Sequence, residues 1–305
     1  MSISVVIPYY NNSGDVDRCL KSILSQTVQP DEVFLIDDCS DDSAYVEKLL
    51  VQYINSLNII YVRNSKNMNG AYSRNYGMSS ATSDYIALLD ADDFWTENHL
   101  ELSLSTLLSN SADFTYSNVT IKKEDLLKKV KVDDVNELIN PKDIILLSPP
   151  QTGSFFFKKS LVTSVLFDEK LRRHQDYQFL LDVILHGCKV VYNDVYTSFY
   201  CVSKNQLTRK LDFASIFSFW NKYKDNFSVR PLQEYLIKML CLNMRTRNEY
   251  NIAIYIDQYP VLEVVKGTSF YKLYSVIGDK NFISRTVLFL YSKVRYDLKK
   301  KINRK

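Results

Sequence analysis

Three aspartates that follow a short apolar run are the residues of this sequence best suited to chemistry. Residues 85–89 read YIALL, which is typical of a buried strand, and Asp90, Ala91, Asp92 and Asp93 come directly after it. Side chains two apart in an extended chain share a side, so we expect Asp90 and Asp92 to face one space while Ala91 turns away. Carboxylates suit Mg²⁺ or Mn²⁺. The motif therefore predicts a metal site, with an acidic, helix-capping turn as the alternative.

Asp38 is a candidate for recognising a nucleotide base. It closes the strand-like run EVFLIDD at residues 32–38. An ionised carboxylate only accepts hydrogen bonds, and uracil presents an N3–H donor where cytosine presents an acceptor. An aspartate at a strand end would therefore select uridine. The surrounding DDCSDDS composition is also that of a surface turn, which is the alternative.

Arg74 is a candidate for holding carbonyl or phosphate oxygens. It lies in NGAYSRNYG, residues 69–77, where a predicted helix begins. Its planar guanidinium matches such oxygens, and Gly70 allows the backbone to approach a ligand closely. Asn67 and Asn75 can add polar contacts, and a surface arginine without a ligand is the alternative.

Asp176 is the candidate general base. It begins a predicted amphipathic helix, QDYQFLLDVILHG, whose apolar face we expect to be buried. The helix dipole and backbone N–H groups are expected to keep the carboxylate ionised, and such a group can take a proton from an attacking hydroxyl. An acid that only stabilises the first helical turn is the alternative. The three histidines are scattered at predicted helix ends and do not form a ligand set.

Buried strands and helices alternate through the first 95 residues. Apolar strand-like runs occur at 3–8, 32–38, 58–64 and 85–90, with helical patterns at 15–27, 43–54 and 71–82 between them. This alternation predicts an α/β fold with a mostly parallel sheet and helices on both faces. We expect Pro8 to end the first strand, because it lacks an N–H group. Ligands of such sheets bind beyond the carboxyl ends of the strands, where all the candidate residues of this half lie.

The rest of the chain is less regular. After residue 113 come strand-like segments, a charged stretch at 122–137 that we interpret as a solvated, mobile insertion, and Gly187, placed to end a helix in a left-handed conformation. Beyond residue 210 the pattern is helical. We therefore predict one domain at 1–210, divided into a nucleotide-binding half at 1–95 and an acceptor half at 96–210, and a helical region with a basic tail at 211–305.

The charge of the chain is unevenly distributed. Overall it is +3, but residues 280–305 hold nine Lys or Arg and one acid, a net +8, which leaves −5 for residues 1–279. A body without basic excess argues against nucleic acid as a partner. Five cysteines without C-x-x-C spacing indicate reduced thiols, and neither a signal peptide nor a membrane span is expected. We expect a cytoplasmic protein that either stays in solution or lies on a membrane surface.

The tail has a pattern of its own. Apolar residues recur at about helical spacing at Phe282, Ile283, Val287, Leu290, Val294 and Leu298, with Lys and Arg around them. A basic amphipathic helix of this kind is typical of contact with an anionic bilayer. A helix that packs on the body, with a frayed basic end, is the alternative.

Taken together, these segments resemble the family-2 inverting glycosyltransferases with the GT-A fold. The resemblance rests on VVIPYYNN, VFLIDDCSDDS and NGAYSRNYGMSSATSDYIALLDADDFW in this order, and it covers nearly all of residues 1–200. The later string from Gly153 to Gly187 resembles the acceptor half of that family. It implies a Rossmann-like domain of the type found in enzymes of bacterial surface polysaccharide synthesis.

The resemblance also implies roles for single residues. Asp38 would read the base, Arg74 would contact the base or diphosphate, Asp90 would lie near the ribose, Asp92 would hold the metal on the diphosphate, and Asp176 would be the base. The implied donor-binding set is Pro8, Tyr10, Asp38, Asn67, Arg74, Asp90 and Ala91, and the implied metal ligands are Asp92 and Asp90. The implied cofactor is Mn²⁺ or Mg²⁺.

The implied reaction moves a sugar from a nucleotide sugar, most simply a UDP-sugar, to a hydroxyl of a saccharide or a lipid-linked saccharide. Gln175 stands where the family usually has Glu, and Ser73 stands where Ala is commoner. No Q-x-x-R-W string is present, which favours single transfers over processive synthesis. A sugar nucleotidylyltransferase is one alternative, although PYYNNSGD lacks a glycine-rich phosphate loop. A catalytically inactive carbohydrate-binding or scaffolding homologue is the other.

Overall fold

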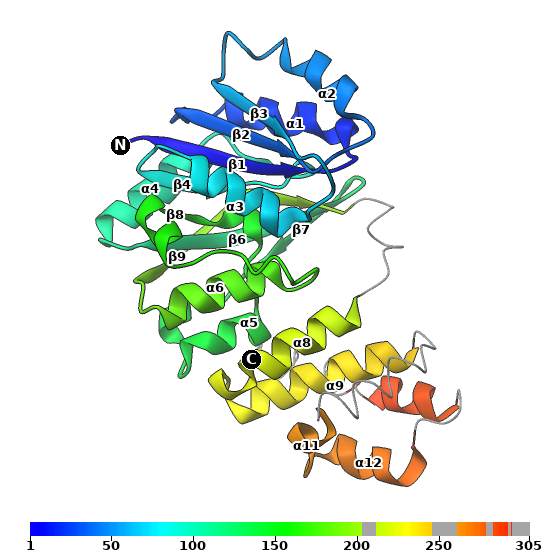
Figure 1. The fold of residues 1–305 in the computed structure, drawn as a ribbon. Helices are drawn as coiled ribbons and strands as arrows, with labels where there is room; N and C mark the ends of the chain where they lie inside the picture. The colour runs from blue at the N-terminus through cyan, green and yellow to red at the C-terminus, as the bar shows by residue number, and fades with distance from the viewer. Residues whose placement is uncertain (203–211, 246–260, 279–282, 292–293, 295–305) are drawn as a thin grey trace. The chain divides into compact units, whose positions relative to one another are not determined.

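The chain divides into two compact units, Met1–Lys210 and Leu211–Lys305. This computed structural model describes residues 1–202, 212–245, 261–278, 283–291 and 294. The described part of the first unit is built on a β-sheet, and that of the second consists of helices (Figure 1).

A mixed sheet runs through the first unit. Its strands, from one edge to the other, are β3 (Ile59–Arg63), β2 (Glu32–Asp37), β1 (Ile3–Tyr9), β4 (Tyr85–Leu88), β8 (Phe156–Lys158), β6 (Phe114–Lys123), β9 (Val190–Cys201) and β5 (Phe94–Trp95), and β7 (Leu126–Val130) pairs with β6. The four strands from β3 to β4 are parallel, as is the β6–β9 pair, whereas β8, β5 and β7 run antiparallel to their neighbours. The predicted α/β fold with a mostly parallel sheet is therefore confirmed.

Helices cover both faces of this sheet (Figure 1). One face packs against α1 (Ser13–Leu24), α2 (Ser43–Leu50) and α4 (His99–Ser109), whose apolar residues share a core cluster with Val5 and Ile7 of β1. The opposite face packs against α3 (Gly70–Ser80). Val6 points away from Val5 and lies against Gly77, where an added Cβ would be 2.5 Å from Val6 Cγ1. Glycine at position 77 therefore lets the helix approach the sheet closely.

Helix α6 (Gln175–Leu185) is anchored by an aromatic cluster. Phe179 stacks on Phe167 with ring centroids 4.3 Å apart, and it also contacts Phe114, Phe155 and Phe157. Gly187, just after the helix, has a φ of +72°, as its position predicted. The remaining short elements of this unit are η1 (Val135–Glu137), η2 (Pro141–Asp143), α5 (Ile144–Leu147), η3 (Thr152–Ser154) and η4 (Lys159–Thr163).

Pro8 does not end the first strand, contrary to expectation. Strand β1 continues to Tyr9, and Pro8 is in register with Ile36 of β2. The Tyr9 carbonyl accepts a hydrogen bond from Asp38 N and so faces β2. Because successive residues point their polar groups to opposite sides, the missing N–H of Pro8 faces the other neighbour, β4, whose pairing with β1 ends at Leu88. Proline is tolerated there because it removes no ladder hydrogen bond.

The charged stretch at 122–137 is also not the loose insertion that we expected. Strand β6 continues to Lys123, and β7 pairs back along it as an antiparallel hairpin with Glu124 in a left-handed conformation. Two of the strand-like segments after residue 113, at 189–195 and 198–202, form one strand, β9, whose register with β6 shifts between Ser117 and Val119. A bulge of this kind interrupts the sequence pattern but not the pairing.

The second unit contains α8 (Phe213–Tyr223), η5 (Lys224–Asn226), α9 (Val229–Arg245), α11 (Val261–Val265), α12 (Ser269–Ile277) and a further helical segment at 283–291. Asp212 caps α8 by accepting a hydrogen bond from Ser215 N at 3.0 Å. Buried Trp220 packs against Phe227 and Tyr235. Within the described ranges of the chain, no helix combines the length and apolar character needed to cross a bilayer.

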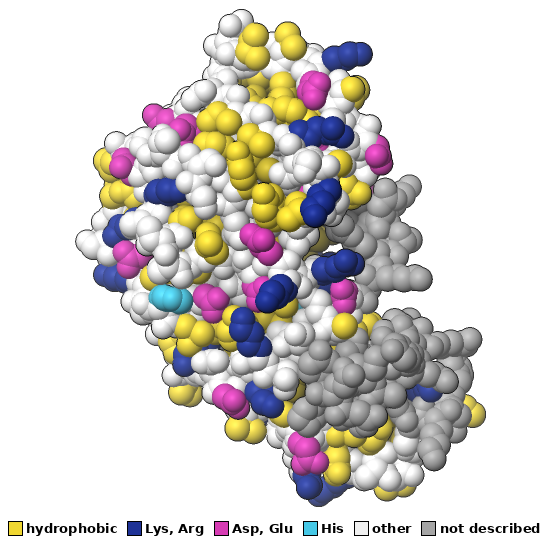
Figure 2. Space-filling view, in the orientation of Figure 1, with side chains coloured by type: hydrophobic (Ala, Val, Ile, Leu, Met, Phe, Trp, Pro, Cys, Tyr) yellow, Lys and Arg dark blue, Asp and Glu magenta, His cyan; other side chains and the backbone are white. Residues whose placement is uncertain are grey.

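Charges of both signs are mixed on the surface. Figure 2 shows Lys and Arg interspersed with Asp and Glu over the face of the first unit that it presents. On this face, the described basic side chains are separated by acidic and uncharged ones.

Candidate active site

The aspartates after β4 gather in a turn. Strand β4 ends at Leu88, and Asp93 N donates a hydrogen bond to Asp90 O at 2.9 Å. One carboxylate oxygen from each of Asp90, Asp92 and Asp93 lies within 4.8 Å of the others. Ala91 is buried in the core cluster and turns away, as predicted. Contrary to expectation, the chain is not extended at this point, because the Asp93 N to Asp90 O bond closes a turn, in which all three acids still meet at the end of the strand.

Two of these three carboxylates, Asp92 and Asp93, have raised pKa values. Burial and then the charge of Asp90 raise the pKa of Asp92 to about 6. Burial and the charges of Asp92 and Asp90 also raise the pKa of Asp93 well above its ordinary value, although its Oδ1 accepts a hydrogen bond from Cys201 N at 2.7 Å. Three close carboxylates with unfavourable mutual charge are a donor set that fits a hard divalent cation.

Arg74 connects this turn to the start of α6. Its Nη2 lies 2.5 Å from Asp90 Oδ1, and its Nη1 donates to Gln175 Oε1 at 3.1 Å. The guanidinium also lies over the ring of Phe167, 5.4 Å from its centroid. Arg74 is therefore nearly buried between two segments that carry candidate acids, and it is not the surface arginine of the alternative interpretation.

Asp176 lies across the same site. Burial raises its pKa to about 6, and the Tyr177 backbone N–H and the charge of Arg74 lower it only in part. The charge of Asp90, in the turn after β4, also raises this pKa. The expected effect of the helix terminus is present but is smaller than desolvation. A carboxylate with this pKa is mostly ionised at neutral pH and becomes mostly protonated as the pH falls below about 6.

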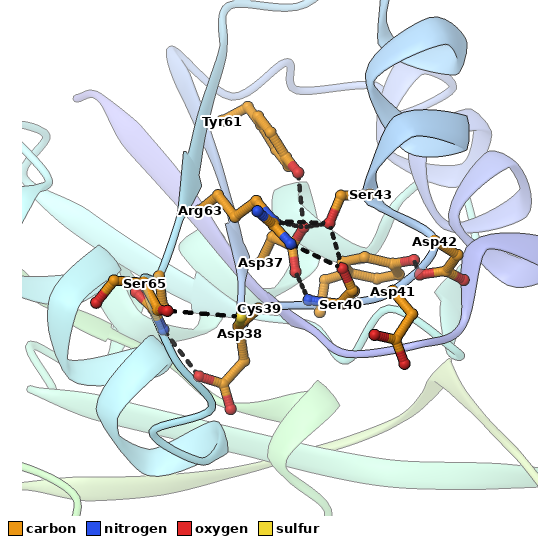
Figure 3. A network of polar contacts seen from close by, with 12 residues as sticks. Asp37, Asp38, Cys39, Ser40, Asp41, Asp42, Ser43, Tyr61, Arg63 and Ser65 are labelled. Atoms are coloured by element: carbon orange, nitrogen blue, oxygen red, sulfur yellow. Dashed lines mark hydrogen bonds and ion pairs between the residues drawn. The ribbon is translucent and has the colours of Figure 1, made fainter.

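Asp38 points toward α3 and away from Asp37 (Figure 3). It is buried, and its carboxylate accepts hydrogen bonds from Asn64 Nδ2 at 2.9 Å, from Met68 N at 2.7 Å and from Asn69 N at 2.8 Å. These bonds shape the loop at 64–69. A carboxylate can accept about four hydrogen bonds, so three protein donors leave room for one further donor.

Asp37 occupies the other side of β2 and serves the fold. It accepts hydrogen bonds from Tyr61 Oη at 2.6 Å and from Ser40 N at 2.8 Å, and also from Ser43 Oγ (Figure 3). Although burial acts in the opposite direction, these bonds hold its pKa below the ordinary value. Arg63 lies 3.7 Å away. The network fixes the loop that follows Asp38.

The remaining predicted donor-binding residues lie around this loop cluster. Tyr10 and Asn67 are exposed, and Pro8 is half-buried. Next to Tyr10, Asn11 N donates to Ser40 Oγ at 3.0 Å, which ties the loop after β1 to the loop after β2. The strand ends thus come together as the topology predicted, and the role of each of these residues in binding a donor stays a prediction.

Two residues that sequence reasoning missed belong to the site. Arg18 Nη2 donates to Asp92 O at 2.5 Å, and Arg18 Nη1 pairs with Asp15 at 2.8 Å. The pKa of Tyr200, on β9, is raised to about 12 by burial and by the charges of Asp93, Asp92, Asp90 and Asp176. A cation near the start of the first helix was a usable signal for Arg18. No local signal marks Tyr200, because long-range pairing of β9 places it.

Comparison with known proteins agrees with this geometry. The family model described as Glycosyl transferase family 2 matches residues 4–177, a range that contains every acid discussed above. The amylovoran biosynthesis glycosyltransferase AmsB of Erwinia amylovora is 31% identical over 200 residues, covering 63% of this chain and 66% of that protein.

Two further proteins extend the comparison. An Escherichia coli enzyme, the UDP-Glc:alpha-D-GlcNAc-diphosphoundecaprenol beta-1,3-glucosyltransferase WfgD, is 31% identical over 119 residues, covering 39% of this chain and 46% of that enzyme. The crystal structure of S. aureus TarS 1-349 in complex with UDP-GlcNAc superposes with a TM-score of 0.61 at 16% identity, covering 96% of this chain and 88% of that one. The match thus spans about half to two thirds of these two curated relatives, and the TarS likeness shows the fold.

Proposed function

The chain belongs to glycosyl transferase family 2, and from this premise we propose that it is an inverting enzyme that transfers a sugar from a UDP-sugar to a saccharide or lipid-linked saccharide in polysaccharide synthesis. One observation carries the proposal. Three carboxylates cluster after β4, and Asp90 among them is close enough to Asp176 to raise its pKa. This observation supports an arrangement in which a cation-binding set and a base face one space.

The donor side of the proposal depends on the strand ends. Asp90 and Asp92 would hold Mn²⁺ or Mg²⁺, which when bound neutralises the charge that grows on a diphosphate leaving group. Asp38 has capacity left for one further donor, such as the N3–H of uracil. WfgD, which shares 31% identity over 119 residues, is named as an enzyme that uses UDP-Glc, and this supports a UDP-sugar here as well.

The acceptor side depends on Asp176. Its carboxylate would take the proton of the acceptor hydroxyl while that oxygen forms a bond to the sugar C1 and the bond from C1 to the diphosphate breaks. The electron pair of the broken bond leaves with the nucleotide, so no acid has to protonate it. Attack from the face opposite the leaving group inverts C1. The names of AmsB and WfgD support a saccharide or a diphosphoundecaprenol-linked saccharide as the acceptor.

The proposal is tested by release of UDP from UDP-glucose and UDP-N-acetylglucosamine in the presence of Mn²⁺. The wild-type protein should release UDP, and Asp176→Asn should lower the rate by at least about 100-fold, because the base is lost. Asp125→Asn, in the exposed β6–β7 turn, is the matched control and should keep the wild-type rate. A wild-type protein that binds the sugars but releases nothing would favour the inactive homologue.

We also propose that the C-terminal helix contacts an anionic membrane surface, which would place the enzyme at the inner face of the cell membrane. Among the described residues, Ile283, Val287, Leu290 and Val294 are 74%, 42%, 50% and 56% exposed, whereas Leu288 is buried. The apolar stripe thus faces outward, although Arg285 of the predicted basic face is buried. Phe282 and Leu298 lie outside the described residues, as do the basic residues of this helix other than Arg285.

Vesicle flotation tests the membrane contact. The full-length protein should float with phosphatidylglycerol vesicles and not with phosphatidylcholine vesicles, because the segment is basic and apolar. Val287→Glu with Leu290→Glu should abolish flotation, and Val276→Glu, at another exposed valine, should not. Equal flotation of all three proteins would contradict the proposal.

A further inference from the structure

The side-chain amide of Gln175 makes two hydrogen bonds just before Asp176. Its Oε1 accepts from Arg74 Nη1 at 3.1 Å, and its Nε2 donates to Leu171 O at 2.6 Å. The first bond reaches α3, and the second reaches the turn that precedes α6. Both bonds also define which end of the amide is oxygen, since Arg74 can only donate and the Leu171 carbonyl can only accept.

Through Arg74, this amide is connected to the acids after β4. The guanidinium is planar, so its two terminal nitrogens hold Asp90 and Gln175 in a fixed relation. The space is closely fitted, because a Cβ at Gly70 would lie 3.2 Å from Arg74 Nη1 and 3.7 Å from Gln175 Oε1. A continuous polar chain thus runs from Asp90 to the residue beside Asp176.

The turn before α6 does not depend on Gln175 alone. Asn75 Nδ2 donates to Phe167 O at 2.9 Å, and Asn75 Oδ1 accepts from Phe167 N at 2.9 Å. Asn69 Nδ2 donates to Glu169 O at 2.8 Å. These amides join α3 to the turn without touching Arg74. Removing the Gln175 amide should therefore leave the turn in place, although it breaks the bond to Leu171 O as well as the connection to Arg74 and Asp90.

We propose that Gln175 is a positioning residue of the reaction, which through Arg74 couples the orientation of Asp176 to the acids that face the donor. This inference depends on the proposed function. Gln175 gives Arg74 Nη1 a hydrogen-bond acceptor that carries no charge. Arg74 therefore stays bonded to α6 whether its Nη2 faces Asp90 or another anion. The start of α6, which carries Asp176, therefore stays at a fixed distance from the acids after β4.

The neutrality of the amide matters because of the groups around Asp176. From the packed elements these are Arg74 on α3, Asp90 after β4 and Tyr200 on β9. Only Arg74 among them is positively charged. A carboxylate at position 175 would place a second negative charge beside Asp176 and would favour its protonated form, which is inactive as a base.

Two variants test the inference in the UDP-release assay, between about pH 5 and pH 9. Gln175→Met keeps the volume and removes both hydrogen bonds. It should lower kcat about tenfold or more while the KM for UDP-glucose or UDP-N-acetylglucosamine changes less than about threefold, because only the base is displaced. Gln175→Glu should move the acid limb of kcat/KM upward by about one pH unit. Gln52→Met, at an exposed position after α2, is the matched control and should match the wild type.

The outcomes separate the two claims. A wild-type protein that releases no UDP overturns the proposed function, and this inference with it. An active wild type whose two Gln175 variants keep the wild-type kcat and acid limb overturns the inference alone. The same holds if Gln175→Glu folds, as judged by thermal denaturation, and loses activity without moving the acid limb, because a merely structural role predicts that result.

Discussion

The carboxyl ends of β2 and β4 carry similar sequences, LIDD and LDADD, and very different electrostatics. Asp37 and Asp38 each receive three hydrogen bonds from neighbouring groups of the protein. After β4, by contrast, the charges of neighbouring acids add to burial and raise the pKa of Asp92 and Asp93. The comparison teaches that the donors around a carboxylate decide its role. The acids at the end of β2 form a set that the fold satisfies, whereas the acids after β4 repel one another and so fit a cation.

The largest expected effect is the loss of catalysis when an acid after β4 is changed. Asp92→Asn should reduce Mn²⁺-dependent UDP release by about 10³-fold, or roughly 4 kcal/mol, because a central carboxylate ligand is lost. Its thermal stability at neutral pH should not fall, since the buried charge beside Asp90 is removed. Rates measured alongside Asp125→Asn provide the check. An active Asp92→Asn would remove the distinction between the two strand ends.

The satisfied set should respond in the opposite way. Asp37→Ala should lower the free energy of unfolding by about 2–3 kcal/mol, because Tyr61, Ser43 and the Ser40 N–H lose a buried acceptor. Urea denaturation of this variant and of Asp92→Ala makes the comparison directly. Equal destabilisation by both substitutions would contradict it.

As the pH falls, Asp176 should be protonated before the hydrogen-bond network of Asp37 is lost. The pKa of Asp176 is raised to about 6, so kcat/KM should fall about tenfold for each pH unit below about pH 6 as the carboxylate is protonated. The pKa of Asp37 is lowered, so its contribution is present above the ordinary aspartate pKa and is lost only as the pH falls through the lower folded value. Rate and circular-dichroism profiles over the same range check both signs. If the rate and the circular-dichroism signal were lost at the same pH, the predicted difference between Asp176 and Asp37 would be refuted.

The smallest effect is expected at Asp38, which is held by protein donors and is also predicted to bind the nucleotide base. Asp38→Asn should weaken UDP binding by about tenfold, since its one remaining acceptor position is lost or reversed. The preference for UDP over CDP should narrow at the same time. Titration calorimetry with the two nucleotides measures both quantities. An unchanged preference would show that Asp38 only shapes the loop at 64–69.

Local pattern predicted much of the fold. The alternation of apolar runs predicted the parallel strands β1 to β4, and Gly187 marked the end of α6. Local pattern also misled where geometry depends on a neighbour. Pro8 continues β1 because the adjacent β4 ends early, and the charged stretch at 122–137 pairs with β6.

The sequence predicted candidate residues for the site but not the contacts between them. The acids and Arg74 were identified, whereas the bridge from Asp90 through Arg74 to Gln175 joins segments about a hundred positions apart. The contact of Asp93 with Cys201 N and the place of Tyr200 depend on β9 in the same way. Periodicity describes one segment at a time, so it cannot reveal which donors reach a carboxylate from another.

The most direct test of the central claim is calorimetric titration of UDP with and without Mn²⁺. The account predicts that Mn²⁺ strengthens UDP binding to the wild-type protein by at least about tenfold and leaves Asp92→Asn unaffected, because the acids after β4 hold the cation. Equal UDP affinity of the wild-type protein with and without Mn²⁺ would contradict it.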